Sequence, residues 1–174
     1  RQQYDDVAVV CYINSTTELK AASDVCVTSS NAVRIVKKLP NKTIFFTPDK
    51  NLGHYVSTQM PEKQFILNDG FCPRHDSIRT DVVQAAKKIH PPALFLAHPE
   101  CHKEVLALAD YIGSTSGIIQ YASASPVQEF IIGTENGVLY ELQTRNPEKV
   151  FYPAMEDQYC INMKKVTLEK VRNC

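Results

Sequence analysis

Two cysteines occupy similar loop positions in this 174-residue chain, and thiols at such positions can hold a metal. Cys72 lies in Gly-Phe-Cys-Pro, and Cys160 lies 88 positions later in Gln-Tyr-Cys-Ile. Two thiolates are too few for a stable zinc or iron-sulfur site, which needs more protein ligands. A third cysteine from another unit would complete a four-iron cluster with one open iron, and an open coordination position allows Lewis-acid chemistry.

Histidines and further thiols allow two other kinds of chemistry. Cys72 with His75 and His98 with Cys101 have the Cys-x2-His and His-x2-Cys spacings of a zinc site. Cys101 or Ser114 with His98 could instead form a nucleophilic pair for hydrolysis, although no nucleophile-elbow pattern surrounds either residue. The residues alone leave these alternatives open.

The composition restricts the class of protein. Hydrophobic residues make up 44% of the chain and charged residues 22%, which is typical of a globular protein. Lys plus Arg and Asp plus Glu number 19 each, so no net field favours nucleic acid as a partner. The longest apolar runs, such as Val7 to Ile13, are too short to cross a membrane. We therefore predict a soluble, cytoplasmic protein without disulfides.

Short apolar runs alternate with amphipathic stretches along the whole chain, which predicts an α/β fold with small parallel sheets. The expected strands are 7–13, 25–28, 43–47, 64–67, 93–97, 111–113, 129–133 and 150–152. The clearest expected helices are 16–22, 31–38, 51–58 and 80–89.

The two halves of the chain are similar to each other. An offset of 86 positions places Tyr12 on His98, and the same offset relates several further positions, namely Asp24 to Asp110, Thr28-Ser29-Ser30 to Ser114-Thr115-Ser116 and Asp49 to Glu135. Cys72 corresponds to Cys160 at an offset of 88. This agreement indicates two homologous three-layer α/β/α repeats. Since Ser15 falls opposite Cys101, the repeat speaks against Cys101 as a metal ligand.

Polar residues follow the predicted strands, at the edge where parallel α/β units bind ligands. They are Tyr12, Asn14, Thr28, Ser29, His98, Glu100, Ser114 and Thr115. Each Ser/Thr cluster alone could simply cap a helix, but two equivalent clusters favour an anion site. Cys11 and Cys26 lie within apolar strands, so we predict buried structural thiols there.

Taken together, the motifs resemble the quinolinate synthase family in order and spacing, over essentially the whole chain. They are YINS at 12–15, DVCVTSSN at 24–31, PDKNLG at 48–53, GFCP at 70–73, HPEC at 98–101, GSTS at 113–116, IGTE at 132–135 and CINMKK at 160–165.

The resemblance implies three homologous domains with pseudo-threefold symmetry around a [4Fe-4S] cluster. On this basis residues 1–77 are the second repeat, 78–163 the third and 164–174 the start of a C-terminal segment. A first repeat is expected to be missing upstream of Arg1, so the chain alone should lack a complete site. Some relatives carry a cysteine pair before the last ligand, but residues 156–159 here are Glu-Asp-Gln-Tyr, so we expect no such redox switch.

The resemblance also implies the reaction, a step of NAD biosynthesis. A transferase of this family condenses iminoaspartate with dihydroxyacetone phosphate to quinolinate, with the cluster as Lewis acid and L-aspartate oxidase as a possible supplier of iminoaspartate. The roles implied here are cluster binding by Cys72 and Cys160, catalysis by Glu100, His98 and Tyr12, and substrate binding by Tyr12, Asn14, Ser29, His98, Glu100, Ser114 and Thr115. Glu100 is the expected general acid/base. One alternative is a non-catalytic anion- or nucleotide-binding module. The other is a zinc-binding protein that uses Cys72, His75, His98 and Cys101 as ligands.

Overall fold

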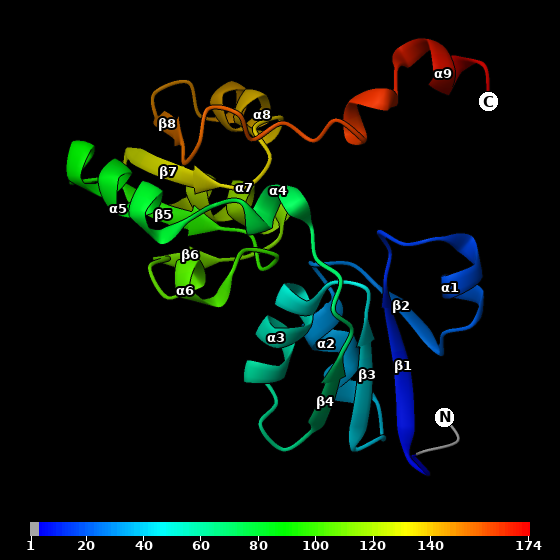
Figure 1. Cartoon of the computed structure of the whole chain (residues 1–174). Helices are drawn as coiled ribbons and strands as arrows, with labels where there is room; N and C mark the ends of the chain where they lie inside the picture. The colour runs from blue at the N-terminus through cyan, green and yellow to red at the C-terminus, as the bar shows by residue number, and fades with distance from the viewer. Residues whose placement is uncertain (1–3) are drawn as a thin grey trace.

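A computed structural model describes residues 4–174, and it consists of two α/β units joined by a short helix (Figure 1). Each unit holds one four-stranded parallel sheet, with strand orders β2-β1-β3-β4 and β6-β5-β7-β8. The two orders are the same once the numbering is shifted by four strands. The structure therefore confirms the predicted pair of α/β repeats, which we call the N-terminal and C-terminal repeats.

The N-terminal repeat follows the expected alternation closely. Its elements are β1 (Val7–Tyr12), α1 (Thr17–Ala21), β2 (Val25–Val27), α2 (Ala32–Lys38), β3 (Thr43–Thr47), α3 (Lys50–Thr58) and β4 (Gln64–Leu67). Thr16 caps α1 through the Leu19 amide, and Asp49 caps α3 through the Leu52 amide. The predicted bounds of these strands and helices differ from the observed ones by at most one residue.

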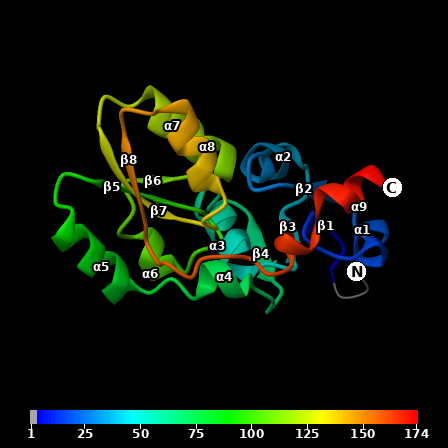
Figure 2. The same ribbon diagram turned by 90° about the horizontal axis from the view of Figure 1, so that it is seen from above.

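The C-terminal repeat is entered through α4 (Pro73–Asp76). Its elements are α5 (Thr80–Ile89), β5 (Leu94–Ala97), α6 (Lys103–Leu106), β6 (Tyr111–Ile112), α7 (Thr115–Ala124), β7 (Glu129–Gly133), α8 (Val138–Arg145) and β8 (Val150–Pro153). The chain then continues through the 3-10 turn η1 (Met163–Lys165) to α9 (Leu168–Arg172). In both views this last stretch extends over the carboxyl end of the N-terminal sheet (Figures 1 and 2). Among residues 4–174, no helix is long and apolar enough to cross a membrane.

Equivalent polar side chains hold equivalent backbone groups in the two repeats. The Asp24 carboxylate accepts from the Val9 amide of β1 at 2.8 Å, and Asp110 accepts from the Phe95 amide of β5 at 2.7 Å. The Lys63 ammonium donates to two carbonyl oxygens at 2.7 Å each. Lys149 does the same at 2.6 and 2.7 Å. The offset of 86 positions therefore corresponds to shared three-dimensional interactions.

The hydrophobic core differs between the repeats. The C-terminal sheet is buried on both faces: Phe95 packs with the α5 and α6 side, and Leu96 packs with the α7 and α8 side. In the N-terminal sheet, one face packs against α2 and α3, whereas Val9 and Phe45 on the other face are only half-buried. Helix α1 contributes no buried residue to that face.

Candidate functional site

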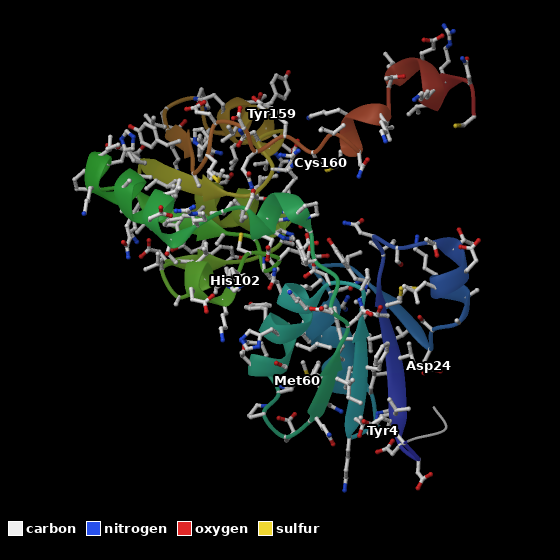
Figure 3. All side chains as sticks on the ribbon, viewed as in Figure 1. Tyr4, Asp24, Met60, His102, Tyr159 and Cys160 are labelled. Carbon is white, nitrogen blue, oxygen red and sulfur yellow. The ribbon has the colours of Figure 1, made fainter. Side chains whose placement is uncertain are left out.

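The carboxyl ends of the strands open into one cavity of about 810 Å³ that is lined by residues of both repeats. Tyr12 and Asn14 come from the end of β1, and Glu100 follows β5. Cys72 and Cys160, the two loop cysteines, line the same cavity. Figure 3 shows Cys160 where the final stretch leaves the C-terminal repeat, whereas Asp24 and Met60 lie toward the opposite end of the N-terminal sheet.

Two acidic residues fix the cysteine loops in equivalent ways. Asp49 accepts from the amides of Leu52 and Cys72, both at 2.8 Å, so one carboxylate caps α3 and holds the first cysteine. Glu135 accepts from the amides of Gly137 at 2.7 Å and Cys160 at 3.2 Å. The match between Asp49 and Glu135 therefore has a structural purpose, which is to set the backbone direction at each cysteine.

Close backbone approach also positions Cys72. The Gly70 carbonyl accepts from the Lys50 amide at 2.7 Å, and this strand-like pairing brings the two loops together. A Cβ atom at Gly70 would lie 2.5 Å from the Pro48 carbonyl oxygen, closer than packed atoms come. Glycine is needed here for proximity rather than for an unusual backbone angle.

Glu100 is deeply enclosed in the cavity, with 3% of its surface exposed, the same fraction as Asp49. Its Oε2 lies 3.3 Å from the Tyr12 hydroxyl, 3.2 Å from His98 Nδ1 and 3.4 Å from His75 Nδ1. Asn14 donates its side-chain amide to the Tyr12 hydroxyl at 3.2 Å. The interaction of Tyr12 with Glu100 joins residues 88 positions apart.

Burial and a second acid keep Glu100 protonated near neutral pH. Burial, followed by the neighbouring Asp49 charge, raises the pKa of Glu100 to about 8. The Asp49 pKa is also raised by burial, but backbone amides favour its charged form. The two carboxyl groups therefore share a proton that resides on Glu100. A protonated acid in an enclosed cavity can donate that proton to a bound molecule.

The histidines beside Glu100 are neutral. The rings of His75 and His98 stack with centroids 4.5 Å apart. Burial lowers the pKa of His75 to about 4. The pKa of His98 is lowered by burial and by the neighbouring His75. Burial also raises the pKa of the Cys72 thiol.

The comparisons with known proteins agree with one another. A family model described as quinolinate synthetase A protein matches residues 1–174. The chain belongs to this family. It is 55% identical over 173 residues to quinolinate synthase from Caldicellulosiruptor saccharolyticus and 50% identical over 171 residues to that from Clostridioides difficile. Quinolinate synthase 2 of Methanosarcina acetivorans is 48% identical over 173 residues.

The family relationship covers nearly all of the chain but only part of each relative. The matches span 98–99% of this chain and 56–57% of those three proteins. The chain thus spans somewhat more than half the length of the quinolinate synthases it resembles.

The structure divides the predicted site residues of this quinolinate synthase family member into two groups. Tyr12, Asn14, Glu100, Cys72 and Cys160 meet at the large cavity, and His98 contacts them through Glu100. Ser29, Ser114 and Thr115 instead line a neighbouring cavity of about 430 Å³. The Ser29 hydroxyl still interacts with Tyr12, so the two cavities are adjacent.

The helix-capping interpretation holds for one of the two hydroxyl clusters. The Ser114 hydroxyl accepts from the Gly117 amide at 3.2 Å and caps α7. In the other cluster, Asn31 accepts from the Thr28 amide at 2.7 Å and makes no cap bond to α2. Glu100 is not a helix cap either, since the residue at the start of α6 is His102.

Two expectations about thiols need correction. Cys26 is exposed rather than buried, because β2 is an edge strand of three residues whose middle side chain faces solvent. Cys11 is buried, as predicted. In the zinc alternative, Cys101 was an expected ligand, but its thiol instead donates to the Gly133 carbonyl at 3.4 Å. Burial also raises the pKa of the Cys101 thiol. Within residues 4–174, the metal-ligand cluster is Cys72, His75 and Glu100.

Asp49 and His75 are two residues of the site whose importance sequence reasoning underestimated. Asp49 was matched with Glu135 in the sequence but was assigned no role in the site. Its match with another acid and its position just before α3 both indicated a functional loop. His75 appeared only in the zinc alternative. Its contacts with Glu100 and Thr134, the latter at 2.9 Å, depend on the packing of the two repeats.

Proposed function

We propose that the chain forms two of the three parts of a quinolinate synthase that acts in NAD biosynthesis. The reaction would condense iminoaspartate with dihydroxyacetone phosphate, with loss of phosphate and water. The family relationship supports this proposal, as does the cavity in which Tyr12, Glu100, Cys72 and Cys160 meet. Because the chain spans only 57% of one of these relatives, we propose the activity for a protein of that relative's full length.

Cys72 and Cys160 would hold a [4Fe-4S] cluster together with one cysteine from outside this chain. The donor set fits such a group: both thiols line one cavity, and both backbone amides are fixed by carboxylates. When bound, the cluster would supply Lewis acidity at an iron without a cysteine ligand.

Glu100 would move protons during the condensation. Its raised pKa, about 8, makes it an acid that holds a proton at neutral pH and can return it after use. Neutral His98 and the Tyr12 hydroxyl both contact its Oε2 atom, so both orient the carboxyl group. Tyr12, Asn14 and His98 would also contact the substrates.

The hydroxyl cavity would bind an anionic group. Ser29, Ser114 and Thr115 line it, with Arg145 at the same cavity, although Arg145 pairs with Glu141 at 2.5 Å. The phosphate of dihydroxyacetone phosphate is the matching group, since hydroxyls and amides at a helix start bind phosphate. L-aspartate oxidase would supply iminoaspartate, and the whole system would lie in the cytoplasm.

The test requires a completed protein, which we define as this chain joined to the part of the Caldicellulosiruptor saccharolyticus enzyme that it does not match. After anaerobic cluster reconstitution, incubation with both substrates should yield quinolinate, measured by chromatography. Omission of either substrate is the control. A reconstituted protein that forms no quinolinate would contradict the proposal.

The anion-binding alternative is favoured by one observation, the hydroxyl cavity on the chain itself. Titration of the 174-residue chain with inorganic phosphate, followed by NMR, would test it. Phosphate binding at Ser114 together with an inactive completed protein would support a non-catalytic module.

A further inference from the structure

The side chains of Cys72, His75 and Glu100 form a compact group at the large cavity, with one ligand atom of each lying within 4.8 Å of the others. His75 Nδ1 is 3.2 Å from Cys72 Sγ and 3.4 Å from Glu100 Oε2. This group differs from the cysteine pair, because His75 and Glu100 belong to it and Cys160 does not.

The two separations from His75 Nδ1 match tetrahedral zinc coordination. Zn–S and Zn–N bonds of about 2.3 and 2.05 Å at a tetrahedral angle separate sulfur and nitrogen by about 3.5 Å. A nitrogen and an oxygen ligand would be about 3.4 Å apart in the same geometry. The two measured separations differ from these values by a few tenths of an ångström or less. The ligand atoms of Cys72 and Glu100 lie within 4.8 Å of each other, so rotation of these two side chains toward His75 would complete the site.

The groups behind the ligands are also suitable. His75 Nε2 lies 2.9 Å from the buried Thr134 hydroxyl. A proton on Nε2 donated to Thr134 leaves the Nδ1 lone pair directed at the metal position. Glu100 is held by Tyr12 and His98, so its carboxyl group is oriented before any metal binds. Such partners are the usual supports of metal ligands.

We propose that Cys72, His75 and Glu100 bind a single Zn²⁺ ion, with the fourth position open to the cavity. Metal binding would release the Cys72 and Glu100 protons, as is usual for such ligands. Because Cys72 would be used, the ion and a cluster held through the same thiol exclude each other. The zinc site itself does not rest on the proposed enzymatic function, whereas this exclusion does.

Binding is tested on the 174-residue chain under reducing conditions. Co²⁺ is the spectroscopic probe, because a thiolate in a tetrahedral Co²⁺ site gives a charge-transfer band and intense visible absorption. Zn²⁺ added afterwards should displace Co²⁺ with one equivalent and abolish the bands. Failure to bind either ion with a thiolate signature would overturn the proposal.

Variants identify the ligands. Cys72→Ser and His75→Ala should weaken Zn²⁺ binding by more than the roughly 10- to 100-fold expected from Thr134→Val, which removes only a supporting group. Cys160→Ser and His102→Ala are the matched controls, since neither residue belongs to the group, and both should bind normally. His75→Gln repeats the test with a closer steric match. Circular dichroism and the metal-free thermal midpoint establish that each variant is folded.

The same variants separate this site from the cluster. In the completed protein before cluster reconstitution, Cys160→Ser should still bind Zn²⁺ and His75→Ala should not. After reconstitution, Cys160→Ser should lack iron and sulfide, whereas His75→Ala should contain both. If Cys160→Ser abolishes zinc binding, or folded His75→Ala retains it, the ion is bound by the cysteine pair and the proposal is wrong.

Discussion

The N-terminal and C-terminal repeats share their framework but differ in the residues placed on it. Asp24 and Asp110 accept from equivalent strand amides, and Asp49 and Glu135 hold equivalent cysteine loops. After the first strand of each repeat, however, the N-terminal repeat has Tyr12 and Asn14 where the C-terminal repeat has His98 and Glu100. Backbone-holding residues are thus similar in both repeats, whereas residues that can carry out chemistry have diverged.

The repeats also differ in how completely their sheets are covered. Both faces of the C-terminal sheet are packed, whereas Val9 and Phe45 remain half-buried on one face of the N-terminal sheet. Substitutions at matching positions of the two repeats can therefore measure how far the repeats differ in chemistry and in stability.

The largest expected effect concerns the equivalent cysteines. In the completed protein, Cys72→Ala and Cys160→Ala should each eliminate the cluster and activity, because a two-cysteine set is too small to hold it. Iron and sulfide analysis after anaerobic reconstitution measures the loss. Cys11→Ala, Cys26→Ala and Cys101→Ala are the controls and should keep near-normal iron. Cluster loss from Cys101→Ala would contradict the assignment.

The next effect tests the chemical difference between the repeats. Glu100→Gln in the completed protein should lower turnover by about 10² to 10⁴-fold, equivalent to roughly 3 to 5 kcal/mol of barrier. Because Glu100 is already uncharged at neutral pH, the thermal midpoint should change little. Steady-state turnover and calorimetry measure both quantities. Exposed Glu104→Gln is the control, and normal turnover of Glu100→Gln would assign proton transfer to His98 or Tyr12.

A third substitution pair tests the difference in sheet coverage. Ile131→Ala on β7 should destabilise the 174-residue chain by about 3 to 4 kcal/mol, because its fully buried side chain leaves a cavity. The equivalent Phe45→Ala on β3 should cost about 1 to 2 kcal/mol, although it removes a larger side chain. Urea unfolding measures both. An equal or larger cost for Phe45→Ala would show that the two faces are equally packed.

The smallest expected effect tests the shared framework. Lys149→Met should cost about 2 to 3 kcal/mol, because it leaves the Ala122 and Ser125 carbonyls without their charged donor. Lys63→Met should cost about 1 to 2 kcal/mol, since Lys63 is only half-buried. Thermal unfolding of both variants beside exposed Lys103→Met gives the comparison. A neutral result for Lys149→Met would mean that the shared interaction does not stabilise the fold.

The sequence determined the type and order of the elements and the repeat. Short apolar runs between amphipathic stretches defined β3 and β7 to the residue, because the strands of a covered parallel sheet are short and largely apolar. The offset of 86 positions identified Asp24 and Asp110 as equivalent, and loop position identified Cys72 and Cys160. These features depend on local patterns that a linear sequence contains.

Only the tertiary structure decided how those residues meet. The exposure of Cys26 depends on β2 lying at a sheet edge, and the raised pKa of Glu100 depends on Asp49 and on burial between the repeats. The group of Cys72, His75 and Glu100 likewise joins residues of both repeats. Desolvation and contact distance are properties of packing, so residues far apart in sequence acquire a common chemistry only when the chain folds.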